Sequence, residues 1–248
     1  MNALRAELLK ARTTRLLLWF AVGLAAFLVL VLSIHIGSHD LDSLRERSTQ
    51  RSIFGFAGLT AIISILIGTI LVTAEYAHGT INQSFLAIPV RGKLLVAKLC
   101  AAVLVVFVLA VCADAVTLLI AELWFHGRGT TLHLGRYTLA PLIGAIGASM
   151  LAAAIGIGIG ALFRRQTAAI VTILLWLLIG EGVIGIIGDG ARFAPGRVLG
   201  AVAVAHSNGV ADRLGVWPAA VVGLLYAAVF CAVGFLLVLG SDVPSSGD

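Results

Sequence analysis

Charged residues are scarce in this sequence. Aspartate, glutamate, lysine and arginine make up 12% of its 248 residues, against about 25% in an ordinary soluble domain. Hydrophobic residues make up 60%, which is more apolar surface than one small core can cover. Because no stretch is polar enough to form a folded soluble domain, the composition indicates a protein whose solvent is the lipid bilayer.

Cysteine and recognisable catalytic patterns are also sparse. Cys100, Cys112 and Cys231 lie far apart in apolar segments, without the spacing of a disulfide framework or a metal site. His35 and His39 are four residues apart and precede Asp40, but the predicted helix ends there and no third ligand is clear, so we expect no metal site. No Ser/His/Asp or Cys/His set falls at one membrane depth, and basic residues do not alternate with aromatics. The sequence therefore argues against an enzyme and against nucleic-acid binding.

What the sequence does contain is a series of long apolar runs. A helix of about 20 residues rises far enough to cross a hydrocarbon core of about 30 Å. We predict six transmembrane helices in one transmembrane domain over residues 1–248, an all-α integral membrane protein. They are expected at about residues 16–36, 53–74, 99–121, 137–163, 168–188 and 218–239.

The residues before the first run form a basic segment, 1–15, with leucines at helical spacing. This pattern predicts a short amphipathic helix in the membrane interface. The run that follows is too long for a signal-peptide core and lacks a cleavage site, so we expect it to be retained. Lysine and arginine are densest before this run, which predicts cytoplasmic N- and C-termini in a cell membrane. The net charge of +5 suits contact with anionic lipid.

The connection between the second and third predicted spans, residues 75–98, is the most informative segment. Thr80 followed by Gln83 is a capping-box pattern, and Pro89 disfavours helix at the residue before it. We therefore predict a short surface helix over residues 81–87.

Phe85 and Leu86 are apolar side chains on this predicted helix. Local physical chemistry leaves two interpretations open. The helix is either an interfacial turn whose apolar side chains enter lipid, or an element that a partner protein binds.

The order of residues in this segment resembles the loop after the second helix in permease subunits of type-2 ABC exporters. The residues that carry the resemblance are Glu75, Gly79-Thr80, Leu86-Ala87-Ile88-Pro89-Val90-Arg91 and Leu94-Leu95-Val96-Ala97-Lys98. The glycine-rich run from Gly156 to the Arg164-Arg165 turn, and Pro195 after the fifth span, are similar to that family as well.

The resemblance implies an exporter in which two permease copies, identical or related, form the substrate pathway. Two separate cytosolic ATPase subunits would bind the short loop helices and would hold ATP and Mg²⁺. The present chain lacks the Gly-x-x-x-x-Gly-Lys-Ser/Thr phosphate loop and is expected to bind no cofactor itself. The residues implied in ATPase coupling are Glu75, Gly79, Thr80, Phe85, Leu86, Pro89 and Arg91.

Two carboxyl groups, Asp114 and Glu181, fall inside predicted spans. A charge at bilayer depth costs about 2.5–3.5 kcal/mol, so each either bonds across helices or lines a cavity that meets a cationic substrate. The family layout favours Glu181 for the pathway. Gly156 and Gly160 form a small-x-x-x-small pair, which is typical of close helix packing.

Other interpretations stay open at this level. One is an intramembrane enzyme that uses Asp114 and Glu181 as an acid pair, and another is a non-transporting scaffold or sensor of the same fold. The sequence does not define the substrate.

The connection 189–217 contains an apolar stretch, 198–205, that is too short to span the bilayer. Pro195 and Gly209 bracket it. We predict a small hairpin or short helices that dip back toward the outer leaflet, in contrast to a plain extracellular loop. Irregular backbone at that depth must be covered by protein or water.

Overall fold

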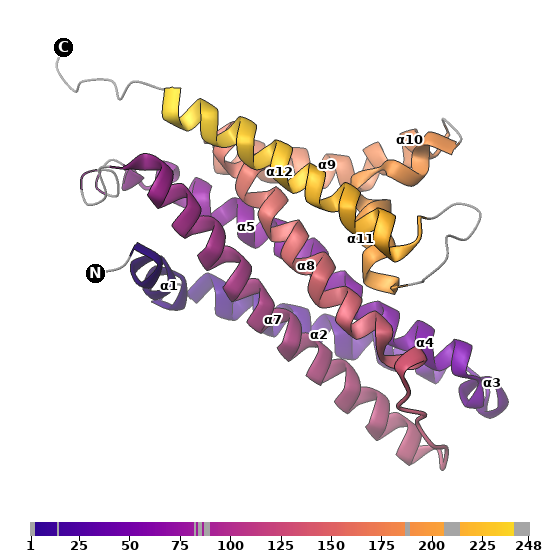
Figure 1. Cartoon of the computed structure of the whole chain (residues 1–248). Coiled ribbons are helices and arrows are strands. Elements are labelled where there is room, and N and C mark those ends of the chain that lie inside the picture. The colour runs from indigo at the N-terminus through magenta and orange to yellow at the C-terminus, as the bar shows by residue number, and fades with distance from the viewer. Residues whose placement is uncertain are drawn as a thin grey trace.

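The computed structural model describes residues 3–13, 15–81, 83, 86, 90–186, 189–205 and 214–240. These residues form a bundle of helices without any strand (Figure 1). Six of the helical segments are long and apolar enough to cross a membrane. The predicted all-α membrane fold with six spans is therefore confirmed. The six segments are Leu17–Gly37, Arg47–Ala77, Gly92–Gly127, Arg136–Phe163, Gln166–Gly185 and Val216–Gly240.

The first half of the chain contributes three long helices and several short ones. Helix α1 (Ala3–Thr13) precedes α2 (Arg15–Gly37), the first span. The second span is assembled from α4 (Arg47–Gly55), a 3₁₀ turn η1 (Phe56–Leu59) and α5 (Thr60–Ala77), after the short α3 (Leu41–Arg45). Helix α7 (Arg91–Gly127) is the third span.

The second half supplies the remaining three spans and a short inserted helix. Helix α8 (Arg136–Phe163) is the fourth span. The fifth consists of α9 (Gln166–Leu175), a π-helical turn η2 (Trp176–Gly180) and α10 (Glu181–Gly185). A 3₁₀ turn η3 (Asp189–Phe193) and α11 (Pro195–Val204) precede α12 (Val216–Gly240), the sixth span.

Two helices extend well beyond the apolar runs that predicted them. The second span begins at Arg47, inside a segment expected to be a loop, because Gln50 finds buried partners there. Its amide donates to the carbonyls of Leu44 (3.0 Å) and Thr131 (3.2 Å). Helix α7 rises about 55 Å over its 37 residues, so both of its ends project past a hydrocarbon core.

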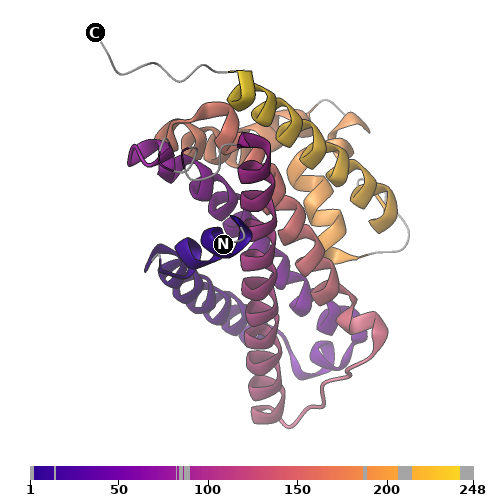
Figure 2. The ribbon, with the colours of Figure 1, turned by 60° about the vertical axis from the view of Figure 1, so that its left-hand side comes forward.

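Helix α8 occupies the centre of the bundle and packs against α5, α7, α11 and α12 (Figures 1 and 2). Its contact with α5 is very close because of glycine. A Cβ on Gly156 would lie 2.2 Å from the carbonyl oxygen of Ile65, and one on Gly160 would lie 2.7 Å from that of Thr69. The Thr69 hydroxyl donates to the Gly156 carbonyl at 3.0 Å.

The apolar stretch after the fifth span forms helix α11 and packs against α8 and α12. Pro195 is its first residue, where the missing N–H costs no intrahelical bond. Val198 and Val202 are buried, and Gly144 of α8 lets the backbone at Val202 approach closely. Of the predicted alternatives, the described residues show a short packed helix, while Gly209 lies outside them.

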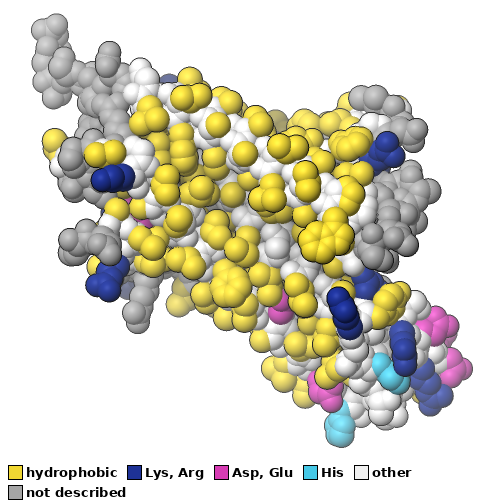
Figure 3. Space-filling view, in the orientation of Figure 1, with side chains coloured by type: hydrophobic (Ala, Val, Ile, Leu, Met, Phe, Trp, Pro, Cys, Tyr) yellow, Lys and Arg dark blue, Asp and Glu magenta, His cyan; other side chains and the backbone are white. Residues whose placement is uncertain are grey.

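The surface agrees with a membrane location. In the view of Figure 3, hydrophobic side chains cover the flanks of the long helices, and charged side chains gather towards the two ends of the bundle. The exposed large apolar residues include Trp19 and Leu30 on α2, and Leu224 and Leu236 on α12. Contact of these apolar flanks with water would be unfavourable, whereas the lipid of a bilayer can cover them.

Candidate functional site

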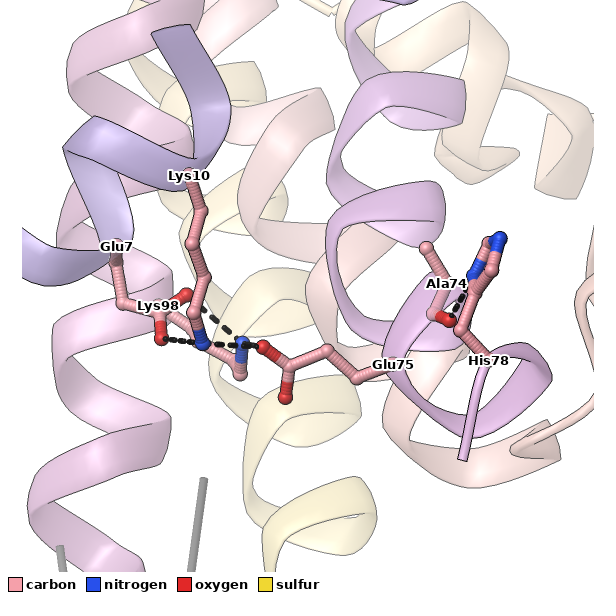
Figure 4. A network of polar contacts seen from close by, with 6 residues as sticks. All are labelled: Glu7, Lys10, Ala74, Glu75, His78 and Lys98. Atoms are coloured by element: carbon pink, nitrogen blue, oxygen red, sulfur yellow. Dashed lines mark hydrogen bonds and ion pairs between the residues drawn. The ribbon is translucent and has the colours of Figure 1, made fainter. Parts of the chain in front are cut away.

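The base of the 75–98 segment holds a cluster of four charged side chains, which we call the charged cluster: Glu7, Lys10, Glu75 and Lys98. They come from α1, from the last turn of α5 and from the second turn of α7 (Figure 4). Glu75 and Lys98 therefore stand at the two ends of the segment that was predicted to bind a partner. The cluster joins both ends to the N-terminal helix.

Each lysine of the charged cluster contacts both carboxylates. The Lys98 ammonium lies 2.6 Å from Glu75 Oε1 and 2.8 Å from Glu7 Oε2. The Lys10 ammonium lies 2.8 Å from Glu75 Oε1 and 3.1 Å from Glu7 Oε1. Two positive and two negative groups thus form a closed and electrically neutral set.

The charged cluster is largely buried, which makes its ion pairs important for stability. Lys98 is only 2% exposed, and Glu7 and Glu75 are also buried, whereas Lys10 reaches the surface. Buried charges persist only when they are paired and hydrogen-bonded. Burial alone would lower the pKa of Lys10, but the hydrogen bonds and charges of Glu75 and Glu7 outweigh it and raise that pKa above its usual value. Lys10 is therefore charged at physiological pH.

Helix α5 ends immediately after Glu75 in a glycine turn. Gly79 has a left-handed φ of +66°, its N–H donates to the Tyr76 carbonyl, and the N–H of Thr80 donates to the Glu75 carbonyl at 2.9 Å. This pattern is a Schellman motif, for which glycine is the favoured residue. Gly79 and Thr80, which were predicted to act in coupling, thus set where the helix stops.

The predicted surface helix lies largely outside the described residues. Ile81, Gln83 and Leu86 are helical, and Leu86 is 84% exposed. Phe85 and Pro89 are not among the described residues, and of Arg91 only the backbone, at the start of α7, is described. Their roles stay predictions.

The comparison with protein families decides the broad identity. The model of the ABC-2 family transporter proteins matches residues 3–180, from α1 to the end of the π-helical turn, and so includes the whole charged cluster. The chain belongs to this family. It is a membrane permease of an ABC transporter, and its membership implies a separate ATP-binding subunit. A search of curated proteins finds no match.

Sequence reasoning found Glu75 in this permease and missed its partners. Lys98 belonged to the quoted motif but had no role, because a lysine at the edge of an apolar run can reach the interface and its position alone does not indicate a partner. Glu7 carried a weaker signal as the single acid in a basic N-terminal segment. No periodic pattern connects residues 7, 75 and 98, so their meeting becomes visible only in the fold.

The two carboxyl groups inside the spans have different surroundings. Glu181 Oε1 accepts hydrogen bonds from the N–H of Gly196 (2.6 Å) and from the Trp176 indole (3.0 Å). It thereby joins the fifth span to the N-terminus of α11. Asp114 is buried in α7, and its Oδ1 has no hydrogen-bond partner among the described residues. The two groups share no hydrogen bond, so the described structure does not form the acid pair of an intramembrane enzyme. Substrate contact by either residue stays a prediction.

A large cavity of about 1260 Å³ lies between α5, α8, α9, α11 and α12. Most of its lining is apolar, with Ile62, Ile159, Phe163, Trp176 and Phe230 among the contributing residues. Sequence reasoning did not anticipate it, because its walls come from many helices, α4 among them, that pack only in the folded chain. Neither Asp114 nor Glu181 is among the described residues that line it.

Proposed function

We propose that this permease is the membrane-spanning half of an ATP-driven exporter. It works as a dimer with a second permease copy and with two cytosolic subunits that bind ATP and Mg²⁺. The observation that carries the proposal is the charged cluster at the base of the 75–98 segment, in a chain of the ABC-2 transporter family.

The charged cluster supports a way for movement of the ATPase subunit to be transmitted to the membrane helices. ATP hydrolysis in a soluble subunit moves a substrate only if that movement enters the membrane helices. Glu75 and Lys98 join α5 to α7 on either side of the segment, and Glu7 and Lys10 add α1. Because a buried ion pair is costly to break, a push on the segment displaces the three helices together.

The same geometry separates two roles within the segment. Glu75 is buried under α1 and does not face a partner, which supports a role in transmitting movement. Leu86 is largely exposed, which supports a role as an apolar anchor for the ATPase. Burial of such a side chain contributes about 1.5–3 kcal/mol.

The first experiment tests this assignment by co-purification. Phe85→Ala combined with Leu86→Ala is expected to leave the permease inserted and dimeric, to reduce recovery of the ATPase by roughly tenfold or more, and to abolish transport. Leu134→Ala is the matched control, because Leu134 is 59% exposed in the loop at the other end of α7. Normal ATPase recovery and transport in the double variant would place the coupling site elsewhere.

A second experiment tests the proposed topology, in which both termini and the 75–98 segment face the cytosol. A membrane-impermeant thiol reagent is applied to intact cells in a cysteine-free background. Ser43→Cys in α3 is expected to react and Leu86→Cys is expected not to react. Labelling of Leu86→Cys from outside would invert the topology and would remove the segment from contact with a cytosolic subunit.

A further inference from the structure

Among the described residues that line the large cavity, Arg51 carries a guanidinium. Arg51 is only 6% exposed. Its guanidinium donates to the carbonyl oxygens of Val204 (2.7 Å), Ala205 (3.0 Å) and Tyr137, whereas its Nε is buried without a partner. Carbonyl groups solvate the guanidinium but do not neutralise it.

In the described part of the chain no carboxylate forms an ion pair with Arg51. Its guanidinium lies over the Tyr137 ring, 4.5 Å from the ring centroid, and this contact does not supply a counterion. Arginine stays charged at every physiological pH, and a buried charge without a counterion is unfavourable. The described lining contains no aspartate, glutamate or lysine, and its one described imidazole, that of His35, has a buried Nε2 without a hydrogen-bond partner. The cavity therefore favours a negatively charged group beside Arg51.

The rest of the lining indicates the chemistry of the part of the ligand that lies away from Arg51. The volume of about 1260 Å³ exceeds the usual 300–1,000 Å³ of a small-molecule site. Aromatic and branched aliphatic side chains, Phe163, Trp176 and Phe230 among them, supply most of the wall. A large apolar body fits this environment, and a small hydrophilic ion does not.

We propose that the cavity binds an amphipathic organic anion, with its anionic group at Arg51 and its apolar body among the aromatic side chains. The inference rests on the proposed function, because it takes this anion to be the transported solute. The proposed solute is an anion, whereas substrate contact by Glu181 would favour a cation. Glu181 lies outside the described lining, and its Oε1 accepts hydrogen bonds from Gly196 and Trp176.

The test measures binding to the permease alone, in phosphatidylcholine vesicles. Trp176 is kept as the single tryptophan by replacing Trp19, Trp124 and Trp217 with phenylalanine, and its fluorescence reports a bromine atom inside the cavity. The probes are ω-bromododecyl phosphate, ω-bromododecanol and ω-bromododecyltrimethylammonium, which share one chain and differ in head-group charge. The phosphate is expected to quench Trp176 at a concentration about tenfold lower than the other two.

A substitution beside Arg51 tests the cause without removing its backbone hydrogen bonds. Ser52 lines the cavity, and Ser52→Asp introduces a carboxylate next to Arg51. This variant is expected to lose the preference for the phosphate probe. Ser43→Asp is the matched control, since Ser43 is partly exposed on α3 and is not among the described lining residues. It is expected to retain the preference.

Three results would overturn the inference. Equal quenching by all three probes would show a cavity that takes any alkyl chain. Displacement of the phosphate probe by phosphatidylglycerol would show that the cavity holds an anionic membrane lipid and not a transported solute. Absence of quenching, with chemical cross-links between copies at the cavity rim, would show that a second permease copy covers it. Because no ATPase is present, these results are independent of the co-purification test: loss of anion preference removes this inference alone, and loss of ATPase recovery removes the proposed function.

Discussion

Replacement of Lys98 by methionine is the sharpest test of the charged cluster. Methionine matches the length of the lysine stem but carries no charge, so the cluster changes from neutral to a net charge of −1. Glu7 and Glu75 then share only Lys10, which is largely at the surface and contributes less. Removal of one partner from a buried ion pair typically costs about 3–5 kcal/mol.

The expected loss is measurable as thermal stability in detergent. A cost of about 3–5 kcal/mol corresponds to a midpoint lowered by roughly 6–20 °C for a chain of this size. The midpoint is followed by the fraction of permease that remains monodisperse in size-exclusion chromatography after heating.

A second variant makes the reasoning refutable. Lys98→Met combined with Glu75→Gln restores neutrality, because Glu7 and Lys10 remain as a pair. The double variant is expected to be more stable than Lys98→Met alone while ATPase activity stays poorly coupled to transport. If the two substitutions simply add, Lys98 and Glu75 do not depend on each other, and the cluster is not the unit that we describe.

Three further predictions follow from close contacts. Gly156→Ala is expected to destabilise the permease in the same heating assay because its Cβ would collide with α5, whereas Gly147→Ala, whose Cβ would be 3.7 Å from its nearest neighbour, serves as the tolerated control. Glu181→Gln keeps a carbonyl acceptor for Gly196 and is expected to preserve stability, whereas Glu181→Ala lowers it; a selective loss of cation transport in Glu181→Gln would instead assign this residue to the substrate. Because the pKa of Lys10 is raised, the stabilising contribution of Lys10 is complete below the ordinary lysine pKa of 10.5 and is lost only as the pH rises further. The stability difference between wild type and Lys10→Met should therefore be constant from neutral to mildly alkaline pH. A difference that changes in this range would contradict the pairing.

The sequence predicted the parts of the fold that depend on local composition. The six spans follow from apolar runs, and Pro195 correctly indicated where a short helix begins. The extent of the second span was not predictable in this way. Its polar first turns are helical because Gln50 and Arg51 bond to loops and helix ends more than 80 residues away, and no local pattern carries that information.

In the candidate site, too, local features could be predicted from the sequence and long-range contacts could not. Gly79 could be predicted to end a helix, because its left-handed φ is a local property that glycine tolerates. The contact of Glu181 with Gly196 and the meeting of Glu7 with Lys98 depend on how whole helices pack. The large cavity is the extreme case, since its walls combine apolar spans with the polar helix α4 and meet only when these helices pack.

The order of the charged cluster along the chain also bears on how the protein is made. Domains are synthesised from the N-terminus, so Glu7 and Glu75 have left the ribosome before Lys98 emerges at the start of α7. A lysine without a partner costs about 2.5–3.5 kcal/mol at the bilayer centre, whereas near a helix end its long side chain can reach the interface. Here both carboxylates are already present when α7 inserts. Of the charged cluster, a nascent chain truncated before Lys98 would carry the two carboxylates and Lys10, so arrival of the third span completes the neutral set that joins α1 and α5 to α7.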